Sequence, residues 1–563
     1  MDYLVFVIAV LIFVVLVFAE GTMRERKNRR IYREWLKESF GRQGDGDLSS
    51  ADLEKISLYH KKMAESDGDR FYIDDITWQD LSMDDIFKNM DTCSCILGEE
   101  SLYHILHRPH LDKDDPQYVH FTGLIKHFEE SVDERLDVQE ILHDIGSTRK
   151  TSVTTVFDHV NSLEGESNTP HYVIDILMAL SIAMIFIVPA VGVVMFVVMM
   201  IVSIGSYLKK KKAVDPILVS FNYTARMLKT IEKLSKLDLK ILKEDTYELN
   251  ELRKPLKGIL GKEIWLTSGS VSMDNPISIL VEYLKMFFHV DLIMTNRLIR
   301  QLKENSENIY RIRTILGTVD ASIAAASYRL SLAVSCDPEF TEEKKAVYTI
   351  ENCVHPLIKD AVSNSIDTDG PILITGSNAS GKSTFLKAVA ISALMAQTVG
   401  YVAASRYRAS RFKIYTSMAL NDSILNGESY FIVEIKSIKR ILDAGNEGRP
   451  VLCCIDEVLR GTNTVERIAA STQILKSLAT DVYIPFAATH DIELTHILEE
   501  VYKNYHFEEE VTVDDVRFNY RMKEGRAQSR NAIRLLQVMD YDQRIIDVAD
   551  AMVEAFVNKG TWV

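Results

Sequence analysis

The sequence has few cysteines, no excess of positive charge and no internal repeat, and each absence narrows what the protein can be. Its 6 cysteines are scattered over 563 residues, which argues against a disulfide framework and favours a reduced, cytosolic setting for most of the chain. Cys93-Ser94-Cys95 has no second ligand pair, so a zinc site is not indicated. The formal net charge of -15 is unfavourable for broad, non-specific DNA binding, although it permits a local basic patch.

Among the features that are present, a phosphate-binding loop carries the clearest chemistry. Residues 371–385 read Pro-Ile-Leu-Ile-Thr-Gly-Ser-Asn-Ala-Ser-Gly-Lys-Ser-Thr-Phe, which is a buried strand, a G-x-x-x-x-G-K-S loop and the start of a helix. Backbone N–H groups of such a loop close around phosphate, and the helix N-terminus faces the anion. We therefore expect Lys382 to contact the β- and γ-phosphates of ATP and Ser383 to bind Mg²⁺. The loop residues expected to bind ATP are Gly376, Ser377, Asn378, Ala379, Ser380, Gly381, Lys382, Ser383 and Thr384.

Two further strand-like runs end in polar residues that suit the same site. One apolar run ends in Asp456 and Glu457, and the next ends at His490. A carboxylate at a strand tip suits Mg²⁺, so Asp456 is expected to share the metal with Ser383, while Glu457 suits a base that orients the attacking water. His490 is placed to sense the γ-phosphate. The expected catalytic residues are Glu457, His490 and Lys382.

The chain also contains two long apolar runs, of which the first lies at the N-terminus. Residues 3–19 form an uninterrupted run of about 17 residues, just enough to span a bilayer as a helix. A cluster of arginines follows, which puts that flank in the cytosol and the N-terminus outside. A cleaved signal peptide is the alternative. Such peptides carry positive charge before the apolar run, however, and only Met1 and Asp2 precede this one.

The second run, residues 176–204, is about 29 residues long and is followed by four lysines, residues 209–212. One straight helix of that length would measure about 43 Å, well over the hydrocarbon core of about 30 Å. The run is either one long tilted span, a membrane hairpin that turns near Pro189 and Gly192, or a buried soluble hairpin. Since the arginine cluster and an ATP-using domain both belong in the cytosol, an even number of crossings favours the membrane hairpin. Arms of about 14 residues then predict a shallow or re-entrant insertion.

The nucleotide-binding half resembles the MutS family of mismatch-repair ATPases. Residues 375–384 are similar to the family's Thr-Gly-Pro-Asn-Met-Gly-Gly-Lys-Ser-Thr, and residues 456–464 (Asp-Glu-Val-Leu-Arg-Gly-Thr-Asn-Thr) to its Asp-Glu-x-x-Arg-Gly-Thr-Ser-Thr. Residues 427–434 resemble its Ser-Thr-Phe-x-x-Glu signature, and residues 488–490 match its Ala-Thr-His. The resemblance covers about residues 350–557 and reaches more loosely upstream, through helical segments similar to the family's core and lever.

This resemblance implies a homodimer in which Ser429, at the start of the signature helix, reaches the ATP of the partner. The bound nucleotide would determine whether the dimer is open or closed, and the lever helices would transmit this conformational change to the membrane segments. The family's mismatch-reading and connector domains have no room here, and Phe128-Glu129-Glu130 matches the mismatch wedge only as a pattern, in a helical, acidic stretch. Ala361 stands where the family stacks an aromatic ring on adenine, and Tyr520 is an alternative for that role.

Two functional classes follow. The first is a membrane-anchored ATPase of this family that still contacts DNA. The second is an ATP-driven membrane scaffold or mechanoprotein that has lost DNA binding and acts on a protein or lipid partner. The family resemblance favours the first, whereas the acidic charge and the missing wedge favour the second. A transporter ATPase is disfavoured, because no Leu-Ser-Gly-Gly-Gln-like signature is present.

The expected fold class is an α/β P-loop ATPase domain with a mostly parallel sheet, joined to an all-α core and lever region and to transmembrane helices. We expect a cell-membrane protein, either multi-pass or anchored with a re-entrant hairpin, whose soluble parts are cytoplasmic. The expected segments are a transmembrane anchor (1–21), a basic juxtamembrane linker (22–50), a first core part (51–170), a membrane hairpin (171–208), a second core and lever part (209–335), the P-loop ATPase (336–528) and a C-terminal helical dimerisation segment (529–563).

Overall fold

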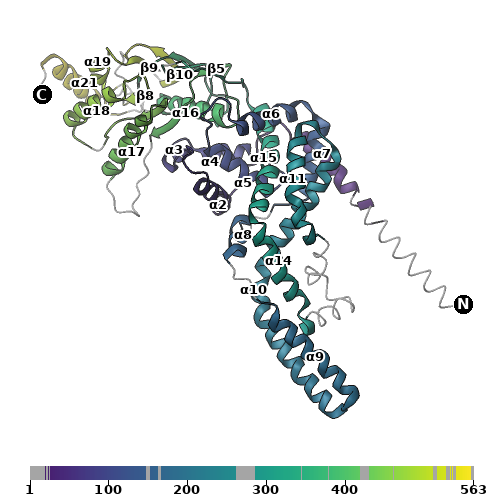
Figure 1. Cartoon of the computed structure of the whole chain (residues 1–563). Coiled ribbons are helices and arrows are strands. Elements are labelled where there is room, and N and C mark those ends of the chain that lie inside the picture. The colour runs from purple at the N-terminus through teal and green to yellow at the C-terminus, as the bar shows by residue number, and fades with distance from the viewer. Residues whose placement is uncertain are drawn as a thin grey trace.

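The computed structural model describes most of the chain. The described residues are 20, 23–24, 26–147, 152–162, 167–260, 286–343, 345–377, 380–418, 430–460, 462–511, 516–527, 533, 536 and 541–559. The N-terminal apolar run and the predicted site residues Asn378, Ala379 and Ser429 lie outside them. Figure 1 shows an elongated molecule with an α/β domain at one end, a bundle of helices in the middle and a long helical arm at the other end.

The α/β domain is built on a six-stranded sheet in the order β10-β9-β4-β8-β7-β6. All neighbouring strands are parallel except β9 and β10, so the expectation of a mostly parallel sheet is confirmed. Alternate residues of β7 enter two separate cores, Leu452 and Cys454 on one face and Val451 and Cys453 on the other, because helices cover both faces. The strands are β4 Ile372–Thr375, β6 Lys413–Ser417, β7 Val451–Asp456, β8 Tyr483–Thr489, β9 Lys503–Val511 and β10 Val516–Glu524, and the helices are α16 Lys382–Thr398, α17 Tyr430–Ala444, α18 Thr464–Leu478, α19 Ile492–Ile497 and α21 Gln543–Lys559.

A second, four-stranded sheet departs from the expected alternation of strand and helix. Its order is β1-β5-β2-β3, with β2 antiparallel to both of its neighbours and β1 parallel to β5. Its strands are β1 Glu339–Phe340, β2 Tyr348–Cys353, β3 Asn364–Thr368 and β5 Arg406–Ala409. The ring of Tyr348 packs against Phe412 and, edge to face, against Phe486 of β8, which fastens this sheet to the larger one.

The middle of the molecule is a helical bundle around α15, as the 3–4 spacing of apolar residues indicates. Its helices are α2 Ser50–Ser66, α3 Asp75–Asp80, α4 Met83–Met90, α5 Ile96–His107, α6 Pro116–Glu130, α7 Val132–His143, α8 Val153–Ser162, α11 Lys243–Arg253, α14 Val290–Glu304 and α15 Ser306–Ser331. Two glycines let α5 and α15 approach closely, since a methyl group at Gly98 would collide with the carboxylate of Asp320 and one at Gly317 would collide with Ser101. Asp320 accepts hydrogen bonds from the backbone N–H of Ser94 (3.0 Å) and Cys95 (2.9 Å), and burial raises its pKa to about 6.

The arm is a hairpin of α9 (Thr169–Ile187) and α10 (Pro189–Leu237), and it projects away from the body (Figure 1). Val188 has a non-helical backbone (φ −134°, ψ 86°) and Pro189 occupies the first turn of α10, so the chain reverses where the sequence predicts a turn. Gly192 is needed just after the turn, because a Cβ there would collide with the backbone of α9 beside Ile185.

The apolar arms of the hairpin are longer than the 14 or so residues expected. Thr169–Ile187 has 19 residues and Pro189–Lys210 has 22, which correspond to about 28 and 33 Å. The expected helix length was too short because only the uncharged run was counted. Helix α9 begins before that run, and its polar residues His171 and Ser181 are buried. Each helix is long and apolar enough to cross a membrane, and only 17% of each apolar window is buried inside the structure. Exposed side chains on this hairpin include Ile176, Leu180, Phe186, Ile187, Val194, Val198 and Ile201.

Polar side chains fix the base of the hairpin to the segment that leads into α14. The Nδ1 atoms of His171 and His289 lie 2.8 Å apart, and Nε2 of His289 lies 3.0 Å from the carbonyl oxygen of Ser203. The hydroxyl of Tyr207 donates to Asp291 at 2.7 Å. The hairpin is therefore attached to the helical bundle by directional contacts as well as by the continuous helix α10.

Candidate nucleotide-binding site

The predicted phosphate loop connects β4 to α16. Gly376 (φ +148°) and Gly381 (φ +108°) both have backbone conformations that L side chains rarely adopt, and a Cβ at Gly376 would lie 2.8 Å from the carbonyl oxygen of Phe507. The ammonium group of Lys382 donates to the carbonyl oxygens of Gly376 and Ser377, both at 2.8 Å, which holds its charge over the loop. The hydroxyl oxygen of Ser380 is buried and has no hydrogen-bond partner among the described residues. The described residues of the loop thus supply glycine conformations and polar atoms of the kind that a phosphate-binding loop requires.

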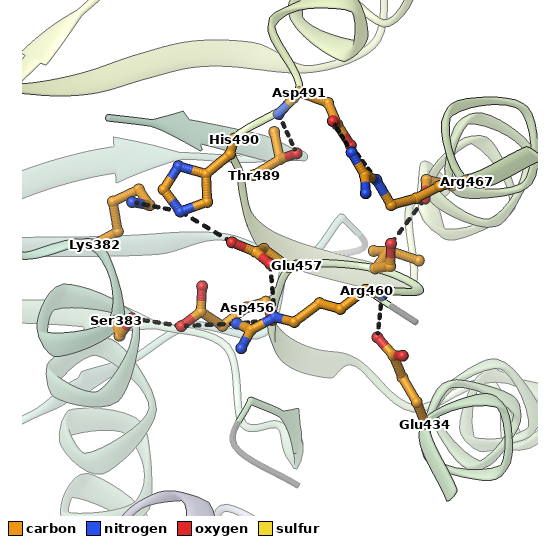
Figure 2. A network of polar contacts seen from close by, with 12 residues as sticks. Lys382, Ser383, Glu434, Asp456, Glu457, Arg460, Arg467, Thr489, His490 and Asp491 are labelled. Atoms are coloured by element: carbon orange, nitrogen blue, oxygen red, sulfur yellow. Dashed lines mark hydrogen bonds and ion pairs between the residues drawn. The ribbon is translucent and has the colours of Figure 1, made fainter. Parts of the chain in front are cut away.

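Ser383 and Asp456 meet as expected for a Mg²⁺ site. Ser383 lies in the first turn of α16, Asp456 is the last residue of β7, and the Ser383 hydroxyl donates a hydrogen bond to the Asp456 carboxylate. Figure 2 shows the two side chains pointing toward each other. A hydroxyl and a carboxylate are oxygen donors of the kind Mg²⁺ prefers, so these residues fit the metal that the loop pattern implies.

Glu457 and His490 are in hydrogen-bonding contact beside Lys382 (Figure 2). Nε2 of His490 lies 2.9 Å from Oε1 of Glu457 and 3.4 Å from Nζ of Lys382. Because one nitrogen cannot donate to the carboxylate and accept from the ammonium at once, the shorter contact to Glu457 sets the tautomer, with the proton on Nε2. This hydrogen bond, more than any other contact, lowers the pKa of Glu457 and keeps its carboxylate ionised.

Arg460 is a site residue to which the sequence assigned no role. Its Nε lies 2.7 Å from Oε2 of Glu457, and its Nη2 donates to the carbonyl oxygen of Asp456 at 2.8 Å. Its backbone N–H donates to the carboxylate of Glu434 on α17 at 3.1 Å, and burial raises the pKa of Glu434. The guanidinium therefore fixes one oxygen of Glu457 while His490 fixes the other, so the carboxylate is held from both sides. The quoted sequence motif contains this arginine, and its spacing of three residues from Glu457 was the signal that could have identified it.

These groups face one cavity of about 920 Å³. Its lining includes residues 380–384 together with Asp456, Glu457 and His490, and it also includes Ala361, Asn364 and Tyr520. Tyr520 lies at a break in the register between β9 and β10, with a positive φ of 53°, and it is 44% exposed. Asn364 holds this bend, because its side-chain amide donates to the carbonyl oxygen of Tyr520 (3.0 Å) and accepts from the N–H of Met522 (2.8 Å).

Comparison with known proteins gives one family and several relatives. Residues 372–557 match the family model for MutS domain V. MutS protein homolog 4 of Mus musculus is 30% identical over 269 residues, which are 44% of this chain and 27% of that protein. The DNA mismatch repair protein MutS of Natronomonas pharaonis is 33% identical over 239 residues (40% of this chain, 27% of the relative), and the DNA mismatch repair protein MSH3 of Saccharomyces cerevisiae is 31% identical over 293 residues (48% and 28%). The matched part of the chain therefore spans less than a third of each relative's length.

Proposed function

Since this chain belongs to the MutS family through its domain V, we propose that it binds and hydrolyses ATP with Mg²⁺. The observation that carries the proposal is the convergence of five side chains from two strand ends and one helix on a single cavity. They are Lys382, Ser383, Asp456, Glu457 and His490. The combination of a phosphate cradle, a site for a hard cation and a polarised carboxylate fits phosphoryl transfer to water.

Each residue has a role in this proposal. The loop N–H groups and Lys382 bind the phosphate chain, while Ser383 and Asp456 hold Mg²⁺, whose charge offsets the charge of the β- and γ-phosphates. Glu457 orients a water molecule and accepts its proton as the water oxygen attacks the γ-phosphorus and the bond to the β–γ bridging oxygen breaks. His490 and Arg460 hold Glu457 at that position, and His490 also contacts Lys382.

Tyr520 is the residue we propose for stacking on the nucleobase. Ala361 has no ring, whereas Tyr520 lines the same cavity and its ring reaches the loop, with Cδ1 lying 3.3 Å from where a Cβ on Gly381 would be. A ring that is half exposed without nucleotide has surface left for a base to cover. In this arrangement the base binds against β10 and the phosphates against α16.

We further propose that the protein is a membrane-anchored homodimer whose nucleotide state moves the arm. The hairpin of α9 and α10 supports the anchor, because its apolar surface is exposed on helices long enough to cross the hydrocarbon core. The proposed N-terminal anchor and the reach of Ser429 into the partner's site rest on the sequence and the family resemblance. The same hairpin favours the second candidate function, an ATP-driven membrane scaffold acting on a protein or lipid, over a DNA-binding role as suggested by the mismatch-repair relatives.

The decisive experiment measures ATP turnover by the purified full-length protein. Lys382→Ala should abolish turnover, because the charge over the phosphates is lost, whereas Lys439→Ala, an exposed lysine paired with Asp443 on α17, should leave it unchanged. Wild-type turnover in Lys382→Ala would refute the assignment of the loop.

Two binding measurements then separate the candidate functions. Turnover and binding assayed with and without duplex DNA at low, stated salt test the DNA role, and the absence of both stimulation and binding removes it. Flotation with liposomes tests the anchor. Removal of residues 1–20 should weaken flotation without abolishing it, because the hairpin remains, and full release would exclude the hairpin from lipid.

A further inference from the structure

One short helix, α3, makes several buried polar contacts between the nucleotide-binding domain and the helical bundle. Asp80 on α3 is 3% exposed, and its Oδ2 accepts hydrogen bonds from the Thr416 hydroxyl (2.7 Å) and from the Met418 N–H (2.9 Å) at the end of β6. The N–H of Thr416 donates to the hydroxyl of Thr77, also on α3, at 3.3 Å. A short helix from the bundle is thus bonded to the backbone of the edge strand of the ATPase sheet.

A second contact joins α3 to helix α17. The guanidinium of Arg440 on α17 pairs with Asp74, whose carboxylate also caps α3 by accepting from the N–H of Thr77 at 2.8 Å. The same guanidinium donates to the carbonyl oxygen of Thr416. Strand β6 and helix α17 therefore share one anchor, and a shift of either element relative to the bundle must act on α3.

Two residues that line the nucleotide cavity contact α3 or Ser82, which lies just after it. Met418, held by Asp80, lines the cavity, and so does Lys387 of α16, whose ammonium donates to the Ser82 hydroxyl at 3.4 Å. Ser82 lies between α3 and α4 with a positive φ of 54°, a conformation that costs a non-glycine residue energy unless its surroundings hold it. Two residues that line the cavity are thus hydrogen-bonded to Asp80 and Ser82, which are only two positions apart in the bundle.

On the other side, α3 packs against helix α5 of the bundle. The indole of Trp78 stacks on His107 of α5 with ring centroids 3.5 Å apart. From there α5 lies against α15 at the close approach made by Gly98 and Gly317. Close-packed elements of this kind move as units rather than deform, so a displacement of α3 is passed to α15.

We propose that α3 is the joint through which the nucleotide site moves the helical bundle, with Asp80 as its central positioning residue. The inference rests on the proposed ATPase function and adds the path by which binding acts at a distance. Asp80 touches neither nucleotide nor metal in this scheme. It acts through Met418 and Thr416.

The test measures binding and movement separately in the full-length protein. Spin labels at Lys476→Cys on α18 and Tyr247→Cys on α11, two exposed positions in the two halves, report their separation by double electron–electron resonance. Labelled protein is diluted with unlabelled protein so that a dimer carries one labelled copy. A non-hydrolysable ATP analogue with Mg²⁺ should change the separation in the wild type. In Asp80→Ala the change should be lost while the Kd for the analogue stays within about threefold.

Three matched variants keep the result interpretable. Asp80→Asn retains an oxygen acceptor of the same shape and should keep most of the change. Thr416→Val removes the hydroxyl that donates to Asp80, keeps the bond from the Met418 N–H, and should reduce the change. Asp85→Ala, an exposed carboxylate on α4 that contacts Lys88, should behave as wild type.

The outcomes distinguish this proposal from the one on which it rests. A normal separation change in Asp80→Ala refutes the joint, as does loss of nucleotide binding in both Asp80→Ala and Thr416→Val, because α3 would then be part of the pocket wall. An Asp80→Ala variant that does not fold, combined with an unaltered response in Thr416→Val, also refutes it. A wild-type protein that binds no Mg·ATP refutes the proposed function itself.

Discussion

Replacement of Tyr520 by alanine tests how the site recognises ATP. The ring is 44% exposed in the cavity, and Asn364 holds its backbone through two hydrogen bonds that do not involve the ring. The substitution therefore removes the stacking surface and leaves the bend of β10 in place. Stacking of a base on an aromatic side chain contributes about 1–3 kcal/mol. ATP binding should weaken by about 5- to 150-fold.

The assay uses two ligands that share the phosphates and differ in the base. Titration calorimetry with Mg·ATP and with Mg·tripolyphosphate should show the loss for ATP only, because the loop, Lys382 and Ser383 are unchanged. Tyr520→Phe serves as the control, since it keeps the ring and should bind ATP as the wild type does. Equal weakening of both ligands, or no weakening of ATP, would show that the base binds elsewhere in the cavity.

Four further predictions concern catalysis, pH dependence, membrane attachment and packing. Glu457→Gln should bind Mg·ATP normally and turn over about 10²- to 10⁴-fold more slowly, measured by phosphate release, and normal turnover would place the base elsewhere. His490→Ala removes the hydrogen bond that most lowers the pKa of Glu457, so the pKa of Glu457 should rise. The acid limb of the pH–rate profile should therefore move to higher pH than in the wild type, and an unmoved acid limb would contradict this. Leu180→Arg puts a charge in the middle of the hairpin at about 2.5–3.5 kcal/mol and should reduce liposome flotation, while Val119→Arg, at an exposed apolar position on α6, should not. Gly98→Ala forces a methyl group against Asp320 of α15 and should lower the free energy of unfolding by about 1–3 kcal/mol, detectable as a lower Tm. An unchanged Tm would show that α5 and α15 can move apart to accommodate the methyl group.

The convergence of the site residues could be predicted from the sequence because they lie at strand ends or in the loop and helix that follow one. Lys382, Asp456 and His490 each follow an apolar run, and parallel strands bring their carboxyl ends to one edge of the sheet, so local patterns were enough to place them together. Strand-end patterns did not predict the contact between Arg460 and the second carboxylate oxygen of Glu457. Arg460 reaches back across a turn in which Glu457 and Leu459 both have positive φ, and no residue-level rule anticipates that bend.

Long-range pairings account for most of what the sequence did not predict. Strand β2 pairs with β5, more than 50 residues later, and both strands are short, so neither periodicity nor length signals the second sheet. The joint at α3 depends on Asp80 meeting Met418, which are 338 positions apart. The hairpin was predicted at the correct turn but with arms that were too short, since the inward-facing polar residues of α9, such as His171, look like the end of an apolar segment.

The continuity of α10 has a mechanical consequence. Its 49 residues form one continuous helix of about 73 Å that runs from the hairpin turn into the body, and Pro216 in its interior lacks the N–H of one helical hydrogen bond, which makes that position the easiest place to bend. A swing of only about 5° about its inner end would carry the turn sideways by about 6 Å. In a fluid bilayer sideways drift meets little resistance, whereas a change of tilt alters the thickness that the apolar helices must match and costs a fraction of a kcal/mol for each ångström. An ATPase coupled to such a helix would thus deform the surrounding lipid mainly when it changes the tilt of the hairpin, and hardly at all when it moves the hairpin sideways.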